Sequence, residues 1–167
     1  MLSLAELDDV ISYLKSKQSP VIILYCVSQY PAHKEYFNLG SIDFLKEKYP
    51  DIPIGFSDHS IGFEIVLQAV ELGAKVIEKH FSLSRNFWGP DHKVSMLPDE
   101  YKEMVNSIRN GDYIKSSPNT YYGVKNKELD GKNNKFRSYF NKVLVASRDI
   151  SEGTVISEDM VYAMRPY

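Results

Sequence analysis

The sequence has little cysteine, no long apolar run and no excess of basic charge. Its single cysteine, Cys26, excludes an internal disulfide, and its place inside an apolar run favours a buried, inert thiol without a catalytic role. The longest apolar stretch, residues 21–27, is far too short to cross a bilayer, and residues 1–6 lack the basic and apolar parts of a signal peptide. These absences favour a cytoplasmic protein.

Charge and composition narrow the kind of partner. Twenty Lys and Arg against 22 Asp and Glu give a net charge of -2, so electrostatics offers no case for binding nucleic acid or a membrane surface. Hydrophobic residues at 43% and charged residues at 25% exclude a disordered chain, and 167 residues are enough for a core. We therefore expect a folded protein whose partner is a small molecule.

Residues 3–109 alternate between amphipathic segments and short apolar runs, which predicts an α/β fold with parallel strands. Ser3 and Glu6 form a capping box, Asn38 can cap a second helix that Pro50 ends, and Pro98 suits a first helical turn. We predict helices from residue 3, over 38–49, over 63–72 and from residue 98, with strands at 21–27, 54–58 and 75–81.

The pattern changes after residue 110. Residues 111–135 are rich in Gly, Asn, Lys, Ser and Asp and predict a linker between a domain at 1–110 and a shorter segment at 136–167. In that segment we expect a strand at 143–145, a turn at 151–153 and further extended or cap structure at 155–156 and 160–163. The segment is too short to fold stably alone.

Polar side chains follow each predicted strand, at the edge where sites of parallel sheets are found. The three groups are Ser28, Gln29 and Tyr30; Ser57, Asp58 and His59; and Glu78, Lys79 and His80. Because side chains two residues apart share a face, Ser57 lies with His59 and Glu78 with His80, while Lys75 and Lys79 point the other way. No spacing here makes Ser57 a triad nucleophile.

Two histidines at adjacent strand ends suggest a metal site. His59 and His80 could share one divalent ion, with carboxylates or water completing its shell, and a hydrogen-bonded structural role for each is the alternative. His33 is expected to be a solvated loop residue. His92 either lines the site or lies at the surface.

These motifs together resemble the sialic acid synthase family, which makes N-acetylneuraminic, legionaminic and other nonulosonic acids. The similar segments are Cys26-Val27-Ser28-Gln29-Tyr30-Pro31, Gly55-Phe56-Ser57-Asp58-His59-Ser60, Gly73-Ala74-Lys75-Val76-Ile77-Glu78-Lys79-His80-Phe81 and Gly89-Pro90-Asp91-His92-Lys93. Further along, residues 143–146, 149–150, 153 and 165–166 resemble the start of the family's antifreeze-like (SAF) domain. The resemblance implies the last three strands of a TIM (β/α)8 barrel followed by the beginning of an SAF β domain.

The implied reaction condenses phosphoenolpyruvate with N-acetylmannosamine or a related N-acetylated amino sugar, releasing phosphate. By this resemblance His59 and His80 are metal ligands and catalytic residues, holding Mn²⁺, or Mg²⁺ or Co²⁺, to polarise the sugar aldehyde. Glu78 is catalytic and contacts the sugar. The other substrate-binding residues implied are Ser28 and Ser57 for phosphoenolpyruvate, Tyr30 and Asp91 for the sugar, and Arg165.

The resemblance also implies a domain-swapped homodimer in which Arg165 reaches the partner's site. A whole barrel takes ~250 residues, so the chain is expected to be a fragment or truncated reading frame with little activity alone. The alternatives are a non-catalytic binding or assembly subunit that takes the other barrel half from a second chain, and a sugar-phosphate-binding relic.

Overall fold

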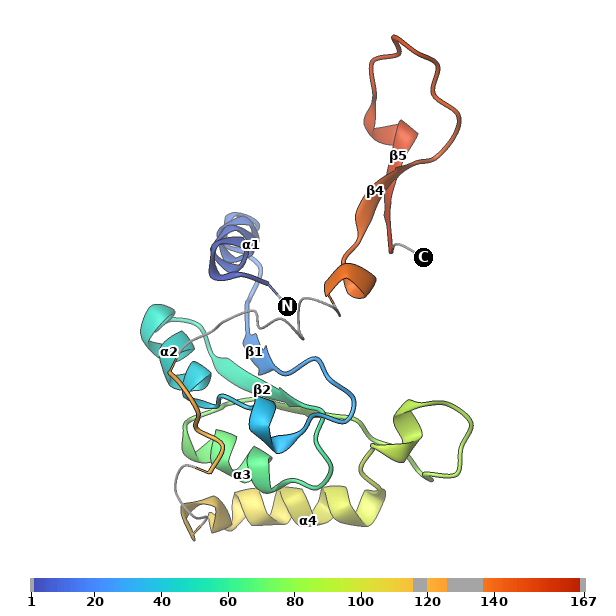
Figure 1. Cartoon of the computed structure of the whole chain (residues 1–167). Helices are drawn as coiled ribbons and strands as arrows, with labels where there is room; N and C mark the ends of the chain where they lie inside the picture. The colour runs from blue at the N-terminus through green and yellow to red at the C-terminus, as the bar shows by residue number, and fades with distance from the viewer. Residues whose placement is uncertain (1, 116–119, 126–136, 166–167) are drawn as a thin grey trace. The chain divides into compact units, whose positions relative to one another are not determined.

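The computed structural model describes residues 2–115, 120–125 and 137–165, and the chain divides into two units, 2–128 and 129–167 (Figure 1). The helices α1 to α4 and a parallel sheet belong to the first unit, and a short helical turn at 137–140 and an antiparallel pair of strands belong to the second. None of the helices in these described ranges is both long and apolar enough to span a membrane.

The first unit is built on three parallel strands in the order β1-β2-β3. They are β1 (Ile23–Cys26), β2 (Ile54–Asp58) and β3 (Ile77–Lys79). The α/β prediction is therefore confirmed, and the range predicted for β2 is confirmed to the residue. The strands expected at 21–27 and 75–81 are shorter, because their apolar runs continue past the last residues that pair with β2.

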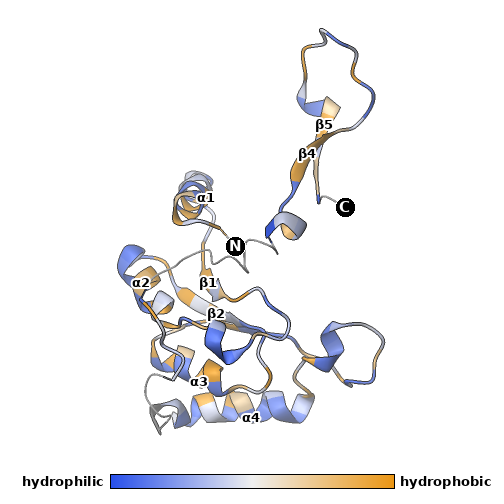
Figure 2. Ribbon diagram, viewed as in Figure 1, coloured by the Kyte–Doolittle hydropathy of each residue, from blue (hydrophilic) through white to orange (hydrophobic). Residues whose placement is uncertain are grey.

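Four α-helices follow the predicted alternation: α1 (Leu4–Ser16), α2 (Gly40–Lys48), α3 (Glu64–Glu71) and α4 (Pro98–Arg109). The capping box before α1 is confirmed, since Ser3 N donates to Glu6 Oε2 at 2.8 Å and Glu6 N to Ser3 Oγ at 3.3 Å. Pro98 occupies the first turn of α4, a helix with both hydrophilic and hydrophobic residues along its length (Figure 2).

The predicted cap of α2 is wrong. The cap position is Leu39, and the Asn38 side chain caps no helix amide. Instead, Asn38 Oδ1 accepts a hydrogen bond from Val124 N at 3.2 Å, so a contact 86 residues away takes the oxygen that the local pattern assigned to the helix.

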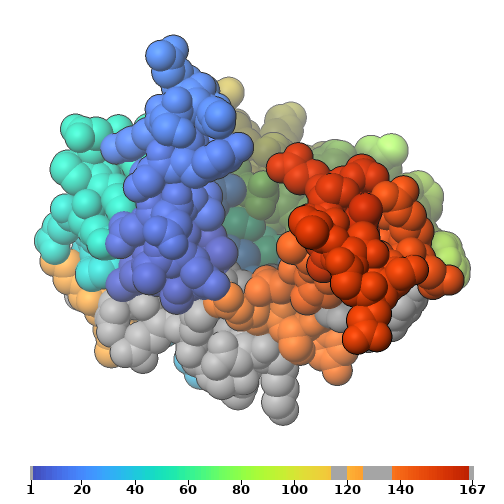
Figure 3. Space-filling view, turned by 90° about the horizontal axis from the view of Figure 1, so that it is seen from above, coloured from blue at the N-terminus to red at the C-terminus, as the bar shows by residue number. Residues whose placement is uncertain are grey.

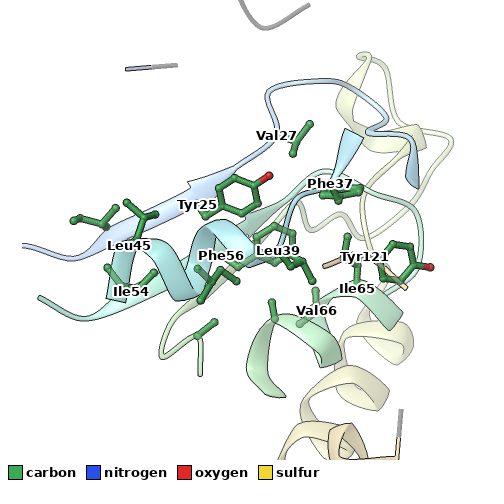
Figure 4. Packing of buried hydrophobic residues seen from close by; sticks show 14 of the residues in the cluster. Tyr25, Val27, Phe37, Leu39, Leu45, Ile54, Phe56, Ile65, Val66 and Tyr121 are labelled. Atoms are coloured by element: carbon green, nitrogen blue, oxygen red, sulfur yellow. The ribbon is translucent and has the colours of Figure 1, made fainter. Parts of the chain in front are cut away.

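The side of the sheet that faces α2 and α3 forms the hydrophobic core. The Phe56 ring lies 6.0 Å from the rings of both Tyr25 and Phe37, and Phe56 is fully buried. Figure 4 shows these side chains filling the space between the strands and the two helices, together with Val27, Leu39, Leu45, Ile54, Ile65 and Val66. Because this face of the sheet packs in the core, the opposite face of the strands remains available for a functional site.

Helix α1 lies against α2 through a polar contact. Tyr49, which follows α2, donates its hydroxyl to Asp8 Oδ1 at 2.7 Å, and Lys48 binds the other carboxylate oxygen at 3.0 Å. The two helices are seen next to each other in Figure 3, α1 in blue and α2 in cyan.

Residues 120–125 fall inside the range expected as linker, yet they belong to the first unit and pack against its helices α2 and α3. Leu39 N and Gly40 N at the start of α2 donate to the carbonyls of Tyr121 and Tyr122 at 2.9 and 2.8 Å. Tyr121 N donates to Gln68 Oε1 of α3, and the Tyr121 ring is buried. Residues 126–135 of the expected linker lie outside the described residues.

The second unit pairs β4 (Val143–Ala146) with β5 (Val161–Met164) in antiparallel register. The strand expected at 143–145 is confirmed. Of the residues expected at 160–163, 161–163 are extended as part of β5, and Met160 ends a 3-10 helix. Ser151 O accepts from Thr154 N at 3.1 Å across the predicted turn, and Gly153 adopts a φ of +80° there. Residues 155–156 precede a short 3-10 helix, Glu158–Met160, and join no strand.

Candidate active site

The face of the sheet away from the core carries the polar residues. The register aligns Cys26 with Ser57 and Ser57 with Glu78, so the three side chains form one row across the strands. Ser57 Oγ donates to Glu78 Oε1 at 2.7 Å.

Gly55 keeps the strands close beneath that row. A Cβ at position 55 would stand 2.5 Å from both Leu24 Cδ2 and Val76 O, well inside contact distance. Because Gly55 has no side chain, β1 and β3 can approach β2 closely at this position.

His59 and His80 meet just past the ends of β2 and β3. Their ring centroids are 5.1 Å apart with the planes at 72°. The Tyr30 ring lies 4.2 Å from the His59 ring and 5.7 Å from the His80 ring, so one aromatic side chain contacts both imidazoles. The structure therefore brings together three residues from three different strand ends.

Burial and the neighbouring His80 lower the pKa of His59, which favours the neutral imidazole at pH 7. The neutral ring is the form that binds metals. Burial, with negative groups nearby, also raises the pKa of the Tyr30 phenol, which keeps it a hydrogen-bond donor.

Cys26 is less buried than predicted, and its side chain lies at the site. It is half-buried and faces the site, with Sγ 3.6 Å from His59 Nδ1 and 3.8 Å from Ser28 Oγ. Sequence reasoning missed this contact because it depends on the register between β1 and β2, which aligns Cys26 with Ser57. Burial raises the pKa of the thiol, which opposes a nucleophilic role.

The segment after β3 adds Asp91 to the site. His80 Nδ1 lies 4.0 Å from Asp91 Oδ2, and Asp91 begins the short 3-10 helix Asp91–Lys93. His92 is half-buried and pairs its Nδ1 with Ser82 Oγ at 2.8 Å, so it holds this loop together. His33 is exposed and contacts the Tyr36 ring, as expected of a loop residue.

Lys79 points to the opposite face, as predicted, and has its own partner there. Its Nζ lies 2.6 Å from Asp58 Oδ2, and both side chains are buried. Sequence reasoning placed Lys79 away from Glu78 but did not find this pair, because the pairing depends on the register between β2 and β3.

The residues present fit a metal ion in part. Two imidazoles, one of them with a lowered pKa, approach each other from neighbouring strand ends. Among the described residues no group of three or more His, Cys, Asp and Glu side chains forms a ready ligand set. A metal held by His59 and His80 would therefore take further ligands from water or substrate, as an open catalytic site does.

Arg165 belongs to the second unit, where its guanidinium lies 5.3 Å from the Phe140 ring centroid. Its expected contact with the site stays a prediction.

Ser28 is half-buried just past the end of β1, on the same face as Cys26.

The chain is an α/β protein with imidazoles, a carboxylate and a hydroxyl at the carboxyl ends of parallel strands. This is the kind of site found in α/β enzymes. More narrowly, the chain belongs to the NeuB family, whose model matches residues 1–119. It is 35% identical to N,N'-diacetyllegionaminic acid synthase of Campylobacter jejuni over 99% of this chain and 48% of that protein.

Solved structures of similar proteins have the same fold as this chain. Spore coat polysaccharide biosynthesis protein SpsE of Bacillus subtilis matches with a TM-score of 0.87 and 33% identity, over 98% of this chain and 48% of that one. The N-acetylneuraminic acid synthetase of Leptospira borgpetersenii matches with a TM-score of 0.64 and 35% identity, over 84% of this chain and 47% of that one. The chain thus spans about half the length of these relatives.

Proposed function

We propose that this chain supplies the metal- and sugar-binding part of a nonulosonic acid synthase. The reaction joins C3 of phosphoenolpyruvate to the aldehyde carbon of an N-acetylated amino sugar such as N-acetylmannosamine; water adds and phosphate leaves. One observation carries the proposal: Ser57, His59, Glu78 and His80 converge on one face at the strand ends of a NeuB-family chain.

The site residues divide between the two substrates. His59 and His80 would hold a divalent cation, with Mn²⁺ the first candidate, which would polarise the sugar aldehyde when bound. Tyr30 contacts both imidazoles and Asp91 lies near His80; together with Glu78 they would bind the sugar hydroxyls.

Glu78 has a second task in this proposal. It accepts a hydrogen bond from Ser57 and is exposed, so its carboxylate can hold or accept a proton at a sugar hydroxyl. Ser57 and Ser28 would donate to phosphoenolpyruvate oxygens.

The remaining parts of the proposal concern the whole protein. The three strands would be the last three of a (β/α)8 barrel, and β4 and β5 the start of an SAF domain. Arg165 would act in a domain-swapped homodimer, and the 167 residues alone would turn over little substrate.

A chimera tests the chemistry directly. This chain would replace the matching half of SpsE, and phosphate release would be measured with phosphoenolpyruvate, Mn²⁺ and N-acetylated amino sugars. We expect condensation by the chimera and its loss to background in His59→Ala and His80→Ala. Full activity in both variants would remove these residues as ligands.

A second candidate function is a binding or assembly subunit whose barrel is completed by another chain. It is favoured by the sheet itself, since in the described chain β1 and β3 each pair with β2 only and leave their outer edges open. Coexpression with the half of SpsE that this chain does not match should then give a stable complex without condensation. A folded monomer in that mixture would count against the subunit.

A further inference from the structure

A buried ion pair lies directly behind the two histidines. Lys79 Nζ and Asp58 Oδ2 are 2.6 Å apart, and their side chains are 2% and 0% exposed. Charges this deep are costly to desolvate, and an apolar pair of similar size is often as stable. Stability alone therefore explains the pair poorly.

The pair is part of a small network that encloses His59. Asp58 accepts from Ser60 N at 2.8 Å and from Ser60 Oγ at 3.0 Å. Lys79 Nζ also donates to Ser60 O at 2.8 Å. One ammonium of β3 thus binds the residues immediately before and after His59.

The network lies where the backbone ladder ends. Asp58 and Lys79 are the last registered pair of β2 and β3, and His59 and His80 come next. Beyond that pair the two backbones turn to different neighbours, since His59 O accepts from Ala32 N and His80 O from Met96 N. In the part of the chain that the structure describes, the Lys79 ammonium therefore connects the two strands at the level of the imidazoles.

We propose that Lys79 and Asp58 are positioning residues that set the separation and angle of the His59 and His80 rings. The inference rests on the proposed function only for its purpose, because the geometry to be held is that of two ligands for one cation. The pair acts from the core side of the sheet and touches neither substrate nor metal.

The test uses the 167-residue chain without metal and reads the two rings by NMR. In the unmodified chain we expect a nuclear Overhauser contact between the rings, and ring protons of His59 shifted by the Tyr30 ring 4.2 Å away. Lys79→Met should abolish the contact and move the His59 ring signals towards random-coil positions, while the core amide signals are retained.

Lys48→Met is the matched control, since Lys48 also pairs with an aspartate but ends α2, before the start of β2, whereas both rings lie past the strand ends. It should leave both ring signatures unchanged. If the charge left on Asp58 unfolds Lys79→Met, the double variant Asp58→Leu/Lys79→Met decides, because it removes both buried charges. It should fold and still lose the contact between the rings.

A folded variant that keeps the ring contact and the ring shifts would overturn the positioning role. Because the readout needs no metal, it is separate from the proposed function. Mn²⁺ that fails to broaden either ring in the unmodified chain would instead count against the metal site, and would leave the positioning result intact.

Discussion

Tyr121→Ala should strongly destabilise the first unit, although the residue belongs to a segment whose composition predicts a linker. The Tyr121 residue is 8% exposed. An aromatic side chain buries roughly 150–250 Å², which at about 25 cal/mol per Å² corresponds to roughly 4–6 kcal/mol. This is an upper bound because the unfolded chain is itself partly compact.

The observed loss should be smaller than that bound, because the backbone bonds of Tyr121 to Leu39 and Gln68 survive the substitution. We expect about 3 kcal/mol in the free energy of unfolding, at the low end for aromatic-to-alanine changes in a core. Urea denaturation followed by far-ultraviolet circular dichroism measures it, with similar slopes required of the two transitions.

Tyr13→Ala is the control, since Tyr13 on α1 is 62% exposed, and its effect should stay within about 0.5 kcal/mol. A loss below about 1 kcal/mol for Tyr121→Ala would contradict the packing argument. Residues 120–125 would then behave as the linker that their composition predicts.

Three further changes test single contacts of the first unit. Gly55→Ala should cost about 1–3 kcal/mol in thermal or urea denaturation, because its Cβ would meet Val76 O at 2.5 Å; unchanged stability would refute the close approach. The Tyr49 hydroxyl and Lys48 lower the pKa of Asp8 below its ordinary 3.8. The ionised carboxylate thus stabilises the fold above that pH, and this is lost as the pH falls through the lower folded value. Tyr49→Phe should flatten that acid-side decline in the urea midpoint, and an identical decline would count against the bond. Ser3→Ala should cost about 1 kcal/mol by urea denaturation, because the capping box loses its acceptor, whereas no loss would mean the cap is not formed in solution.

Local signals in the sequence predicted most of the first unit. The Ser3 capping box, Pro98 and the apolar run of β2 act within a few residues, so they can be recognised without knowing the fold. Asn38 and Tyr121 could not be placed in this way. Their partners lie 86 and 53 residues away, and tertiary contacts override the local preference of each.

The site shows the same division. Alternation along a strand predicted that Ser57 shares a face with His59 and Glu78 with His80, since the period of two needs no partner strand. The link between Lys79 and Asp58 needed the register of two strands and could not be seen in either one. The contact of Cys26 with His59 was missed for the same reason.

The central claim is that His59 and His80 together hold one divalent cation. Titration of the 167-residue chain with Mn²⁺, followed by the ring signals of both histidines, tests it most directly. We predict that both rings broaden over the same range of Mn²⁺ concentration and that His80→Ala weakens the broadening at His59. Rings that stay sharp, or that broaden independently of each other, would contradict the claim.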